Sequence, residues 1–345
     1  MTQKYILVDT MNLFFRARHT AHRGADLLDK LGLSIHIMLA AANKVAKHEH
    51  VDHVVFALEG RNNWRKAFYP PYKKQRAEER AAASEEQIEE DEMYFETLND
   101  LVGFLKTYTN SSVITEDTAE ADDVIARWIK LHPDDEHIIL SSDSDFQQLI
   151  SETVTIYNGI TKETITLNGT FNDNDKPIID KKTNLPKQIE DPKWILFEKC
   201  MRGDKSDNVF SAYPGVRKKG SKNKVGLLEA FEDRTKKGYA WNNLMLQRWM
   251  DHKDSEHKVI DDYERNVKLI DLDAQPDDIK NNVDEAIINT VLTDMLTRKA
   301  NNQISFQFMK FCGKHDLDKL AQYPESVLTW MTKPYKGDIA KYGTD

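Results

Sequence analysis

The sequence predicts an α/β fold in which helices cover both faces of a mostly parallel β-sheet. Short apolar runs typical of buried strands alternate with longer stretches of helical composition. This alternation indicates crossover connections, in which a helix joins two neighbouring parallel strands. Carboxylates follow directly after several of the apolar runs. Because ligands of such sheets bind at the carboxyl ends of the strands, this second observation bears on function.

Five apolar runs are predicted to be strands. Each is too short for a stable helix and is rich in β-branched and other apolar residues, which favour buried parallel strands. We place the strands at residues 5–8, 54–58, 112–115, 138–141 and 154–157.

Much of the remaining chain is predicted to be helical. The stretch 73–108 has no proline and is rich in Ala, Glu, Gln and Arg, so we expect helix there, with a break near Ala83 and Ser84. The polar residues 159–190 predict an irregular or hairpin insertion, and residues 326–345 predict a loose tail. Further helices are predicted at residues 31–48, 119–131, 192–202, 224–233, 239–250, 256–269 and 284–300.

Composition bounds the class of protein. The 345 residues, of which 40% are hydrophobic, suffice for two or three domains with real cores. No run of 18 apolar residues occurs, so we expect no membrane-spanning segment and no membrane partner. Residues 5–8 are predicted to form a strand directly after the N-terminus, so we expect no signal peptide. The two cysteines exclude a disulfide framework and a cysteine-based zinc site, and a reducing, cytoplasmic location is expected.

The distribution of charge favours nucleic acid as a partner, although the net charge is −9. Basic residues gather in residues 61–80 and in residues 214–224, and the second segment contains no acid. Local basic patches decide phosphate contacts more than net charge does. The acidic stretch 84–100 is interpreted as a solvated helix face.

The carboxylates that follow the predicted strands indicate a metal site. Asp143 and Asp145 leave one strand end together, and Asp9 and Glu59 follow two other strands. Two carboxylates 4 Å apart repel by roughly 4 kcal/mol in the dielectric of a protein surface, so their convergence requires a cation. Oxygen ligands of this kind suit hard ions, most simply Mg²⁺ or Mn²⁺.

Each of the other motifs, taken alone, also has an ordinary structural interpretation. The acids of Glu120–Asp123 would suit a helix N-terminus, and Asp204 with Asp207 would suit a turn and a helix cap. Residues 214–224 could be a basic surface loop, or part of a helix-hairpin module that offers backbone N–H groups to a phosphate.

In their order along the chain, these motifs resemble those of the flap endonuclease/5′→3′ exonuclease superfamily, the 5′-nucleases. The resemblance covers about residues 4–290. Each motif is weak alone, and their shared order carries the resemblance. The motifs are Asp9; Asn63-Trp64-Arg65-Lys66 with Tyr72-Lys73-Lys74-Gln75-Arg76; Glu120-Ala121-Asp122-Asp123 with Ser142-Asp143-Ser144-Asp145-Phe146; and Gly203-Asp204-Lys205-Ser206-Asp207-Asn208.

The resemblance implies a domain organisation. Residues 1–200 would form a PIN-like, Rossmann-like catalytic domain with a helical arch at about 61–108 and the insertion at about 159–190. Residues 201–300 would form a helical, helix-hairpin DNA-binding region of the H3TH type, followed by a C-terminal extension over residues 301–345.

The resemblance also implies the site residues and two Mg²⁺ or Mn²⁺ ions. Catalytic roles fall to Lys73 and Arg76, which would face the scissile phosphate, with Arg65 nearby. Glu59 stands where the family usually has aspartate and is included among the expected metal ligands. The first ion would be held by Asp9, Glu120, Asp122, Asp143 and Asp145, with Asp123 close by, and the second by Asp204 and Asp207.

The expected partners are branched or nicked DNA and RNA·DNA duplexes with 5′ ends, bound by a monomer. A sliding clamp and a single-strand-binding protein are further partners implied by the family, and a monovalent cation is implied at the helix-hairpin. Nucleic-acid contacts are implied for Lys74, Arg217, Lys218, Lys219, Lys222 and Lys224.

The implied activity is that of a divalent-metal-dependent hydrolase that acts near 5′ ends in DNA replication, as a flap endonuclease, a 5′→3′ exonuclease or an RNase H-type remover of primers. If the chain is phage-encoded, the location would be the host cytoplasm. The alternative is a nuclease-dead protein of the same fold that binds nucleic acid by its structure. A small-molecule phosphatase is disfavoured because Asp9 is not part of a D-x-D pair.

Overall fold

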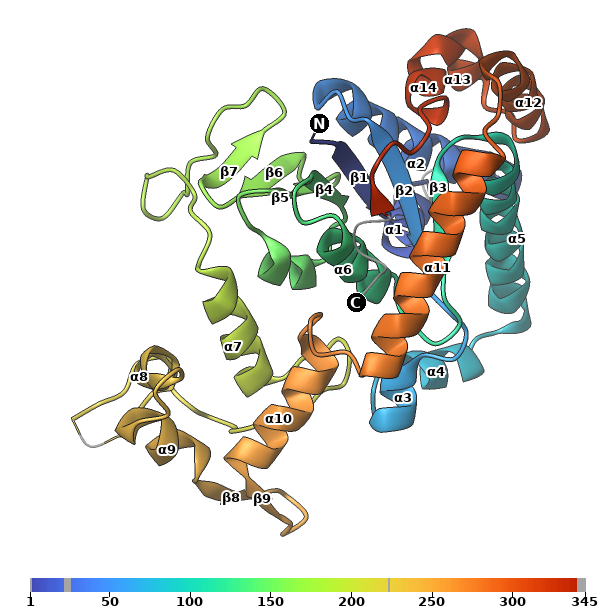
Figure 1. Ribbon diagram of the computed structural model, residues 1–345. Helices are drawn as coiled ribbons and strands as arrows, with labels where there is room; N and C mark the ends of the chain where they lie inside the picture. Colours follow the sequence, from blue (N-terminus) through green and yellow to red (C-terminus); the bar gives the residue numbers. More distant parts are fainter. Residues whose placement is uncertain (1, 22–25, 223, 340–345) are drawn as a thin grey trace. The chain divides into compact units, whose positions relative to one another are not determined.

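The computed structural model describes residues 2–21, 26–222 and 224–339, which form two compact units. Figure 1 labels their helices and strands. The first unit comprises residues 1–63, 83–189 and 277–345, and the second comprises residues 64–82 and 190–276.

A seven-stranded, mostly parallel sheet in the first unit confirms the predicted fold class. Its order is β3-β2-β1-β4-β5-β6-β7 (Figure 1). Strands β1 to β5 are parallel, while β6 and β7 add an antiparallel hairpin from the predicted insertion. The strands are β1 (Lys4–Asp9), β2 (His53–Leu58), β3 (Ser112–Thr115), β4 (Glu136–Leu140), β5 (Val154–Asn158), β6 (Glu163–Thr166) and β7 (Gly169–Asn172).

The strand order reverses at β1. On one side β2 leads on to β3, and on the other side β4 leads on to β5. Val8 pairs with Phe56 of β2 and with Leu140 of β4, so the three strands end at the same edge of the sheet. In open parallel sheets, ligands bind at the carboxyl ends of the strands next to such a reversal. The sequence therefore brings the segments after β1, β2 and β4 to the expected functional edge.

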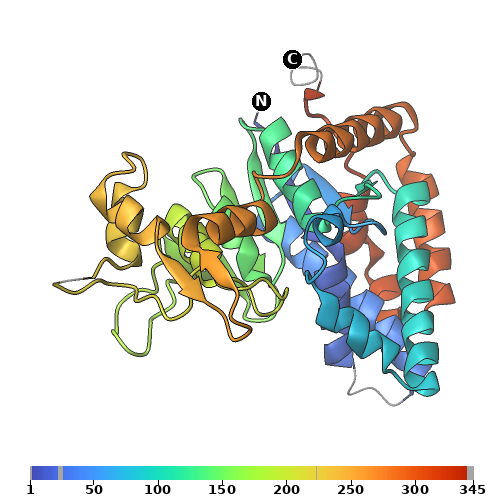
Figure 2. The same cartoon turned by 90° about the horizontal axis from the view of Figure 1, so that it is seen from below.

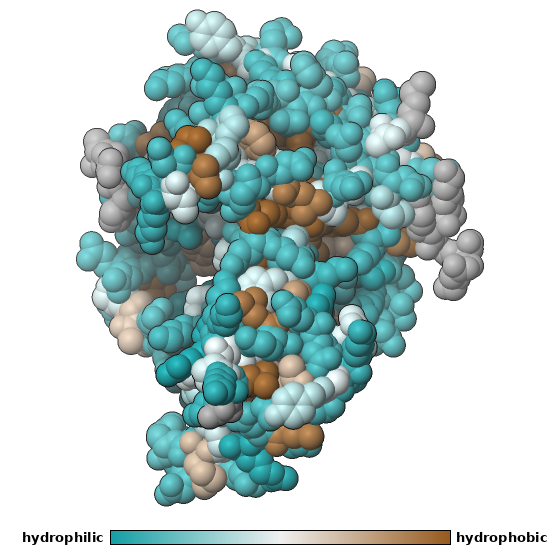
Figure 3. Space-filling view, turned by 90° about the vertical axis from the view of Figure 1, so that its left-hand side faces the viewer, coloured by the Kyte–Doolittle hydropathy of each residue, from teal (hydrophilic) through white to brown (hydrophobic). Residues whose placement is uncertain are grey.

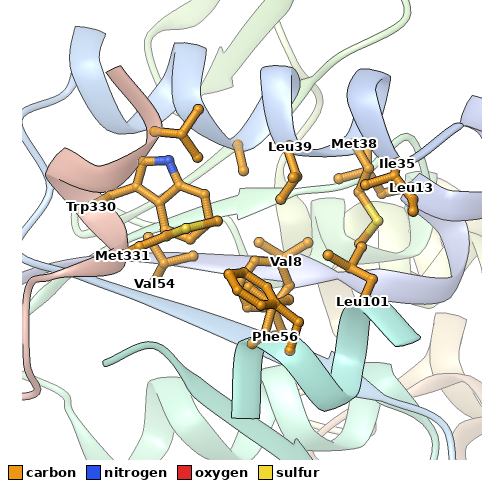
Figure 4. Close-up of a cluster of buried hydrophobic side chains, with 14 of the residues drawn as sticks. Val8, Leu13, Ile35, Met38, Leu39, Val54, Phe56, Leu101, Trp330 and Met331 are labelled. Atoms are coloured by element: carbon orange, nitrogen blue, oxygen red, sulfur yellow. The ribbon is translucent and has the colours of Figure 1, made fainter. Parts of the chain in front are cut away.

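One face of the sheet carries the main hydrophobic core. It is covered by α2 (Leu27–His48), α5 (Glu85–Tyr108) and α14 (Pro324–Met331). Figure 4 shows Val8 and Phe56 of the sheet among Leu39 of α2, Leu101 of α5 and Trp330 of α14. Alternate residues of each strand point to this face, because successive side chains of a strand lie on opposite sides.

The other face is covered by α6 (Ala121–Leu131) and α11 (Asp277–Leu296), which pack against each other and against the sheet. The Arg127 guanidinium of α6 donates to both carboxylate oxygens of Asp284 in α11, at 2.7 and 2.6 Å. Such paired hydrogen bonds fix geometry as well as contributing energy. Residues 277–296 were expected within the helix-hairpin region 201–300, but this packing places them in the first unit.

The predicted loose tail over residues 326–345 is wrong for its first part. Helix α14 buries Val327, Trp330 and Met331 in the main core, because these side chains recur on one face of the helix. Two further helices, α12 (Asn301–Lys314) and α13 (Asp318–Gln322), precede it, and Figure 2 shows the C-terminal helices beside α5. The last six residues of the predicted tail, 340–345, lie outside the described residues.

The predicted arch, residues 61–108, consists of three helices. The expected break is confirmed, because Ser84 caps α5 through its hydroxyl and Gln87 completes a capping box. From Tyr94 onward, one face of α5 is buried in the core of the first unit, through residues that include Leu98, Leu101 and Leu105. A helix that the sequence pattern did not predict, α1 (Thr10–Ala21), follows β1.

The second unit is mainly helical around an aromatic core that includes Trp194, Phe197 and Trp241. The two helices predicted at 239–250 and 256–269 are each shortened, because their facing ends form a β-hairpin around a tight turn. Its helices and strands are α3 (Trp64–Phe68), α4 (Lys74–Ala81), α7 (Pro192–Arg202), α8 (Leu227–Asp233), α9 (Tyr239–Met245), β8 (Arg248–Met250), β9 (Glu256–Lys258) and α10 (Val259–Ile270).

Among the described residues, no helix combines the length and apolar character needed to cross a membrane. On the face that Figure 3 shows, hydrophilic side chains predominate, in keeping with a chain of which 30% is charged.

Three histidines are buried at the amino-terminal edge of the sheet. His53, His132 and His137 are each 1% exposed and pack around Tyr5. Burial disfavours the protonated ring and lowers the pKa of His53 to about 4 and that of His137 to about 3. These rings are therefore neutral in the folded protein at neutral pH.

Acid is expected to destabilise the first unit through these rings. Below pH 6.5, the usual histidine pKa, these histidines bind protons in the unfolded chain but not in the folded chain. The free energy of unfolding therefore falls as the pH drops toward about 4. His137→Phe removes one such proton site and should flatten this fall in urea titrations at pH 7 and pH 5. The exposed His19→Gln serves as control, and equal pH slopes for His137→Phe and the parent would contradict the expectation.

Candidate metal centre and nucleic-acid interface

Asp9 lies at the centre of the candidate metal site. It is the last residue of β1 and is 5% exposed. Its Oδ2 accepts a hydrogen bond from Ser141 Oγ at 2.8 Å, and its Oδ1 accepts one from Asn12 N at 3.3 Å. Burial, with smaller contributions from the charges of Asp143 and Glu59, raises the pKa of Asp9 to about 7 despite these hydrogen bonds. The carboxylate thus lies in a place that disfavours its charge.

The segment after β4 is tied to the end of β1 by hydroxyl groups. Ser141 Oγ, which donates to Asp9, also accepts a hydrogen bond from Asp143 N at 3.0 Å. Ser142 donates its N–H and its hydroxyl to Asn12 Oδ1, at 3.2 and 2.8 Å. The network holds Asp143 beside Asp9, which explains the charge coupling between them.

A short 3₁₀ helix, η1 (Ser144–Leu149), places Asp145 after Asp143. Asp143 Oδ1 caps this helix by accepting from Asp145 N at 2.9 Å. Phe146, which is fully buried, anchors the segment in the protein. The spacing of two aspartates around one serine therefore serves a helix cap and leaves both carboxylates at the edge of the sheet.

Glu59 is exposed and follows β2 in a loop that touches the start of α6. Gly60 N donates to Ala119 O at 2.8 Å, so the loop lies against the residue before Glu120. A Cβ on Gly60 would approach Glu116 O to 2.1 Å, which shows why a glycine stands here. Of the strand-ending acids, Glu59 and Asp143 are both close enough to raise the pKa of Asp9.

The three acids at the start of α6 differ in their surroundings. Asp123 is 0% exposed, and its Oδ2 accepts a hydrogen bond from Glu120 N at 3.0 Å, as in a helix cap. Glu120 is also buried, whereas Asp122 is partly exposed. The helix-cap interpretation thus holds for Asp123, while metal ligation by Glu120 and Asp122 stays a prediction.

The donors of the first unit fit a hard divalent ion by their chemistry. The acids brought toward one edge are carboxylates, and the buried Asp9 forms no ion pair with a lysine or arginine of the described chain. Within residues 2–21, 26–222 and 224–339, no three His, Cys, Asp or Glu side chains already stand close enough to ligate one ion. The ligand set as a whole stays a prediction.

The second pair of predicted ligands belongs to the second unit and is already paired with cations there. Lys199 Nζ lies 2.7 Å from Asp204 Oδ2. Burial acts to raise the pKa of Asp204, but the hydrogen bonds from Lys199 and Ser206 outweigh it and lower that pKa. Asp207 accepts from Arg76 Nη2 at 2.7 Å. The argument that uncompensated carboxylates require a metal therefore does not extend to Asp204 and Asp207.

Asp207 contacts two of the residues expected to be catalytic, Lys73 and Arg76. Lys73 Nζ lies 3.7 Å from Asp207 Oδ2, and Tyr72 OH donates to the same oxygen at 3.0 Å. Lys73 N also donates to Asp207 O at 2.8 Å and holds Lys73 at a φ of 51°, a left-handed conformation that is strained for lysine. The turn that carries Asp204 and Asp207 thus positions Lys73 and Arg76.

Two other predicted cations have different surroundings. Arg65 is 1% exposed, its Nε donates to Leu269 O at 2.9 Å, and its guanidinium lies over the Trp64 ring. The side chain is thus built into the protein, and its place near the scissile phosphate stays a prediction. Lys74 is exposed and pairs with Glu78 one helical turn on.

The basic loop, defined here as residues 217–222 and 224–226, exposes its cations, whereas the amides of Gly220 and Gly226 are occupied within the protein. All five cations of the loop are exposed, and Lys218 also pairs with Glu190 and lies over Trp194. The backbone N–H groups of Gly220 and Gly226 bind the carboxylate of Glu229 instead of solvent. The expectation that this loop offers backbone N–H groups to a phosphate is therefore wrong for these two amides.

Three functional contacts were missed at the sequence level. Asn12 binds both Asp9 and Ser142, Tyr72 binds Asp207, and Glu229 binds the basic loop. Asn12 could have been found from its place three residues after Asp9 at a helix start, and Glu229 from its place three residues after Gly226. The partner of Tyr72 is distant in sequence, so no local sequence pattern predicts this contact.

The chain matches a known family. The family model described as the N-terminal resolvase-like domain of 5′-3′ exonucleases matches residues 4–176, which make up half of the chain. The chain is 27% identical over 282 residues to Ribonuclease H of Enterobacteria phage T4, covering 74% of this chain and 77% of that protein. It is 24% identical over 228 residues to Flap endonuclease of Escherichia phage T5, covering 66% of this chain and 69% of that protein.

Solved structures share the fold. The T5 D15 protein co-crystallised with metal ions superposes with a TM-score of 0.57 at 21% identity, over 84% of this chain and 99% of that one. A complex of the T5 D15 flap endonuclease with DNA and metal ions gives a TM-score of 0.57 at 20% identity with the same coverage.

Asp9→Asn is expected to stabilise the metal-free protein at pH 8. The pKa of Asp9 is raised from 3.8 to about 7. Protonation of this side chain therefore adds to the free energy of unfolding at low pH, and this stabilisation is lost as the pH rises through about 7. At ~1.4 kcal/mol per pKa unit, the gain has an upper bound of about 4 kcal/mol. Urea titrations at pH 8 measure it, with the exposed Asp29→Asn as control. Added Mg²⁺ should stabilise the parent but not Asp9→Asn, and a less stable metal-free variant would contradict the assignment.

Proposed function

The chain belongs to the 5′→3′ exonuclease family, and we propose that it is a divalent-metal-dependent 5′-nuclease that hydrolyses phosphodiester bonds near the 5′ ends of branched or nicked nucleic acid. The observation that carries the proposal is the buried Asp9, coupled to Asp143 and Glu59 at the reversal of strand order. A carboxylate whose charge is disfavoured by burial and by other acids gains most from a bound cation.

The proposed ligands of a first divalent ion are Asp9, Glu120, Asp122, Asp143 and Asp145, with Glu59 and Asp123 beside them. Carboxylate oxygens of this kind suit Mg²⁺ and Mn²⁺. When bound, the ion supplies Lewis-acid stabilisation of charge on the phosphate oxygens and a water of lowered pKa. Ser141 and Asn12 would keep Asp9 oriented for this role, because they hold one carboxylate oxygen each.

A second ion at Asp204 and Asp207 is proposed from the family resemblance alone. In the second unit these carboxylates are neutralised by Lys199, Lys73 and Arg76, so an ion there would compete with existing ion pairs. No step is assigned to it. A monovalent cation at the helix-hairpin likewise stays a prediction.

Lys73 and Arg76 are proposed to neutralise negative charge that develops on the phosphate during hydrolysis. Their support is the strained backbone of Lys73 and the shared contact of both side chains with Asp207. Strain of this kind persists where surrounding contacts enforce it, and it concentrates at functional sites. Lys74, which is exposed on α4, is proposed to contact the nucleic-acid backbone.

The proposed grip on duplex comes from the exposed cations Arg217, Lys219, Lys222 and Lys224, joined by Lys218 once it leaves Glu190. Contacts to phosphate carry no base information, so sequence specificity is expected to be low. The substrates proposed are 5′ flaps, nicks and RNA·DNA duplexes, by analogy with relatives called Flap endonuclease and Ribonuclease H. A role in replication in the cytoplasm, with a sliding clamp and a single-strand-binding protein as partners, is part of the same analogy.

A nuclease assay tests the proposal. The parent should cleave a 5′-flap duplex near its 5′ end when Mg²⁺ or Mn²⁺ is added and should be inactive with a chelator. Substrates labelled at the 5′ or the 3′ end, including nicked and RNA·DNA duplexes, separate flap cleavage from exonuclease and primer removal. Asp145→Asn should lower kcat by on the order of 100-fold or more, as when a group acting on transition-state charge is lost.

The exposed Asp29→Asn is the matched control for this assay, because it makes the same chemical change away from the site. Full activity of Asp145→Asn would remove that residue from the mechanism. Tight binding of the flap by the parent, without cleavage at any metal concentration, would instead support a nuclease-dead binding protein.

A further inference from the structure

The basic loop closes upon itself before helix α8. Ser221 N donates to Lys224 O at 2.8 Å and Lys224 N donates to Ser221 O at 3.1 Å, so these two residues pair with each other. At its base, the first two N–H groups of α8 are used internally, because Leu227 N donates to Arg217 O at 3.0 Å and Leu228 N donates to Lys218 O at 2.9 Å. The described backbone of the loop thus pairs with itself, while Arg217, Lys219, Lys222 and Lys224 are exposed.

One carboxylate joins the two sides of this loop. Glu229 accepts from Gly220 N at 3.1 Å through Oε1 and at 3.0 Å through Oε2, and Oε2 also accepts from Gly226 N at 2.9 Å. Hydrogen bonds from backbone N–H groups to a charged carboxylate are about twice as strong as neutral ones. Burial acts to raise the pKa of Glu229, but the backbone hydrogen bonds and the charge of Lys219 lower it overall. Glu229 is therefore an anion held by the amides of the loop.

The two glycines make this arrangement possible. A Cβ on Gly220 would meet Lys224 O at 2.3 Å, and a Cβ on Gly226 would meet Gly220 N at 2.4 Å. Each added carbon would also lie close to Glu229 Oε2, at 3.1 Å and 2.9 Å respectively. Any larger residue at Gly220 or Gly226 would push apart the two backbone segments of the loop that the Glu229 carboxylate joins. Glycine at both positions thus serves the approach of the backbone to an internal anion.

We propose that Glu229 is a positioning residue for nucleic-acid binding: it fills the amide cradle of the basic loop and fixes the loop so that Arg217, Lys219, Lys222 and Lys224 meet the phosphates of duplex nucleic acid. The inference rests on the proposed function, because it takes duplex nucleic acid as the substrate of this surface. Contact with phosphate is made by the ammonium and guanidinium groups, since the two glycine amides are occupied.

The proposal reverses the effect that charge alone predicts. Glu229→Gln removes one negative charge beside four cations, so electrostatics alone would tighten duplex binding and steepen its dependence on salt. A neutral glutamine loses the charge that strengthens these hydrogen bonds, and its NH₂ takes the place of an oxygen that accepts from Gly220 N, so a positioning role predicts weaker binding. Glu229→Asp keeps the charge and shortens the reach by one methylene, so it too should weaken binding.

The matched control is Glu232→Gln. Glu232 lies on the same helix, is exposed, and forms no hydrogen bond with the loop in the described part of the chain. It makes the same change in net charge without touching the loop. Its duplex affinity should equal or slightly exceed that of the parent.

The experiment measures affinity for a fluorescent duplex of about 20 base pairs by anisotropy, without divalent metal, from 50 to 200 mM salt. Glu229→Gln and Glu229→Asp should bind three- to tenfold more weakly than Glu232→Gln, and the amides of Gly220 and Gly226 should lose hydrogen-exchange protection. Unchanged thermal unfolding shows that the fold is intact, and the exchange of residues outside the loop serves the same purpose. Equal or tighter binding by Glu229→Gln, or unchanged protection of both amides, would overturn the proposal.

The double variant Lys219→Ala/Lys222→Ala tests the proposed duplex binding by the basic loop separately from the positioning role of Glu229. Loss of two phosphate contacts should reduce the slope of log affinity against log salt by about 2, at roughly 0.9 per contact. An unchanged slope would remove the loop from the interface and would count against the proposed grip on duplex. A reduced slope together with parent-like binding by the Glu229 variants would overturn the positioning role alone.

Discussion

The candidate site depends on one buried carboxylate, Asp9, for which the described residues supply no lysine or arginine partner. Asp9 lies where the strand order reverses, and its hydrogen bonds come from a serine hydroxyl and a backbone amide. Neither donor carries a full positive charge, so the two hydrogen bonds do not cancel the cost of burial or the repulsion from Asp143 and Glu59. β1, which carries Asp9, lies in the interior of the sheet and pairs with a parallel strand on each side.

The acids of the second unit show the opposite solution to the same problem. Asp204 and Asp207 have lysine and arginine partners, and Glu229 has two backbone amides. Each of these carboxylates shapes a segment: the first two form the turn that holds Lys73, and Glu229 fixes the basic loop. A carboxylate with its own donors is thus a structural element, whereas burial disfavours the charge of Asp9, which we propose as a metal ligand. The distinction follows from partners and burial, not from the number of acids in a motif.

The sheet could be predicted from sequence because each strand is a short apolar run and the helices between strands are periodic. All five predicted strands and the break before Ser84 are confirmed, and the family is the one that the motifs resembled. The C-terminal helix α14 was not predicted because its burial depends on packing against the sheet, which the local sequence does not indicate. The pairing of Asp207 with Lys73 could not be predicted from local sequence either, because the two residues are far apart along the chain. Burial of Arg65 likewise depends on a contact with the distant Leu269.

The central claim is that the carboxylates at the ends of β1 and β4 bind a divalent ion. A crystal soaked with Mn²⁺ and measured at the manganese absorption edge tests it most directly. The account predicts an anomalous peak within ligand distance of Asp9 and Asp143, at about 2.2 Å from carboxylate oxygens, and its loss in Asp9→Asn crystals. Well-ordered crystals with saturating Mn²⁺ and no peak beside Asp9 would contradict it.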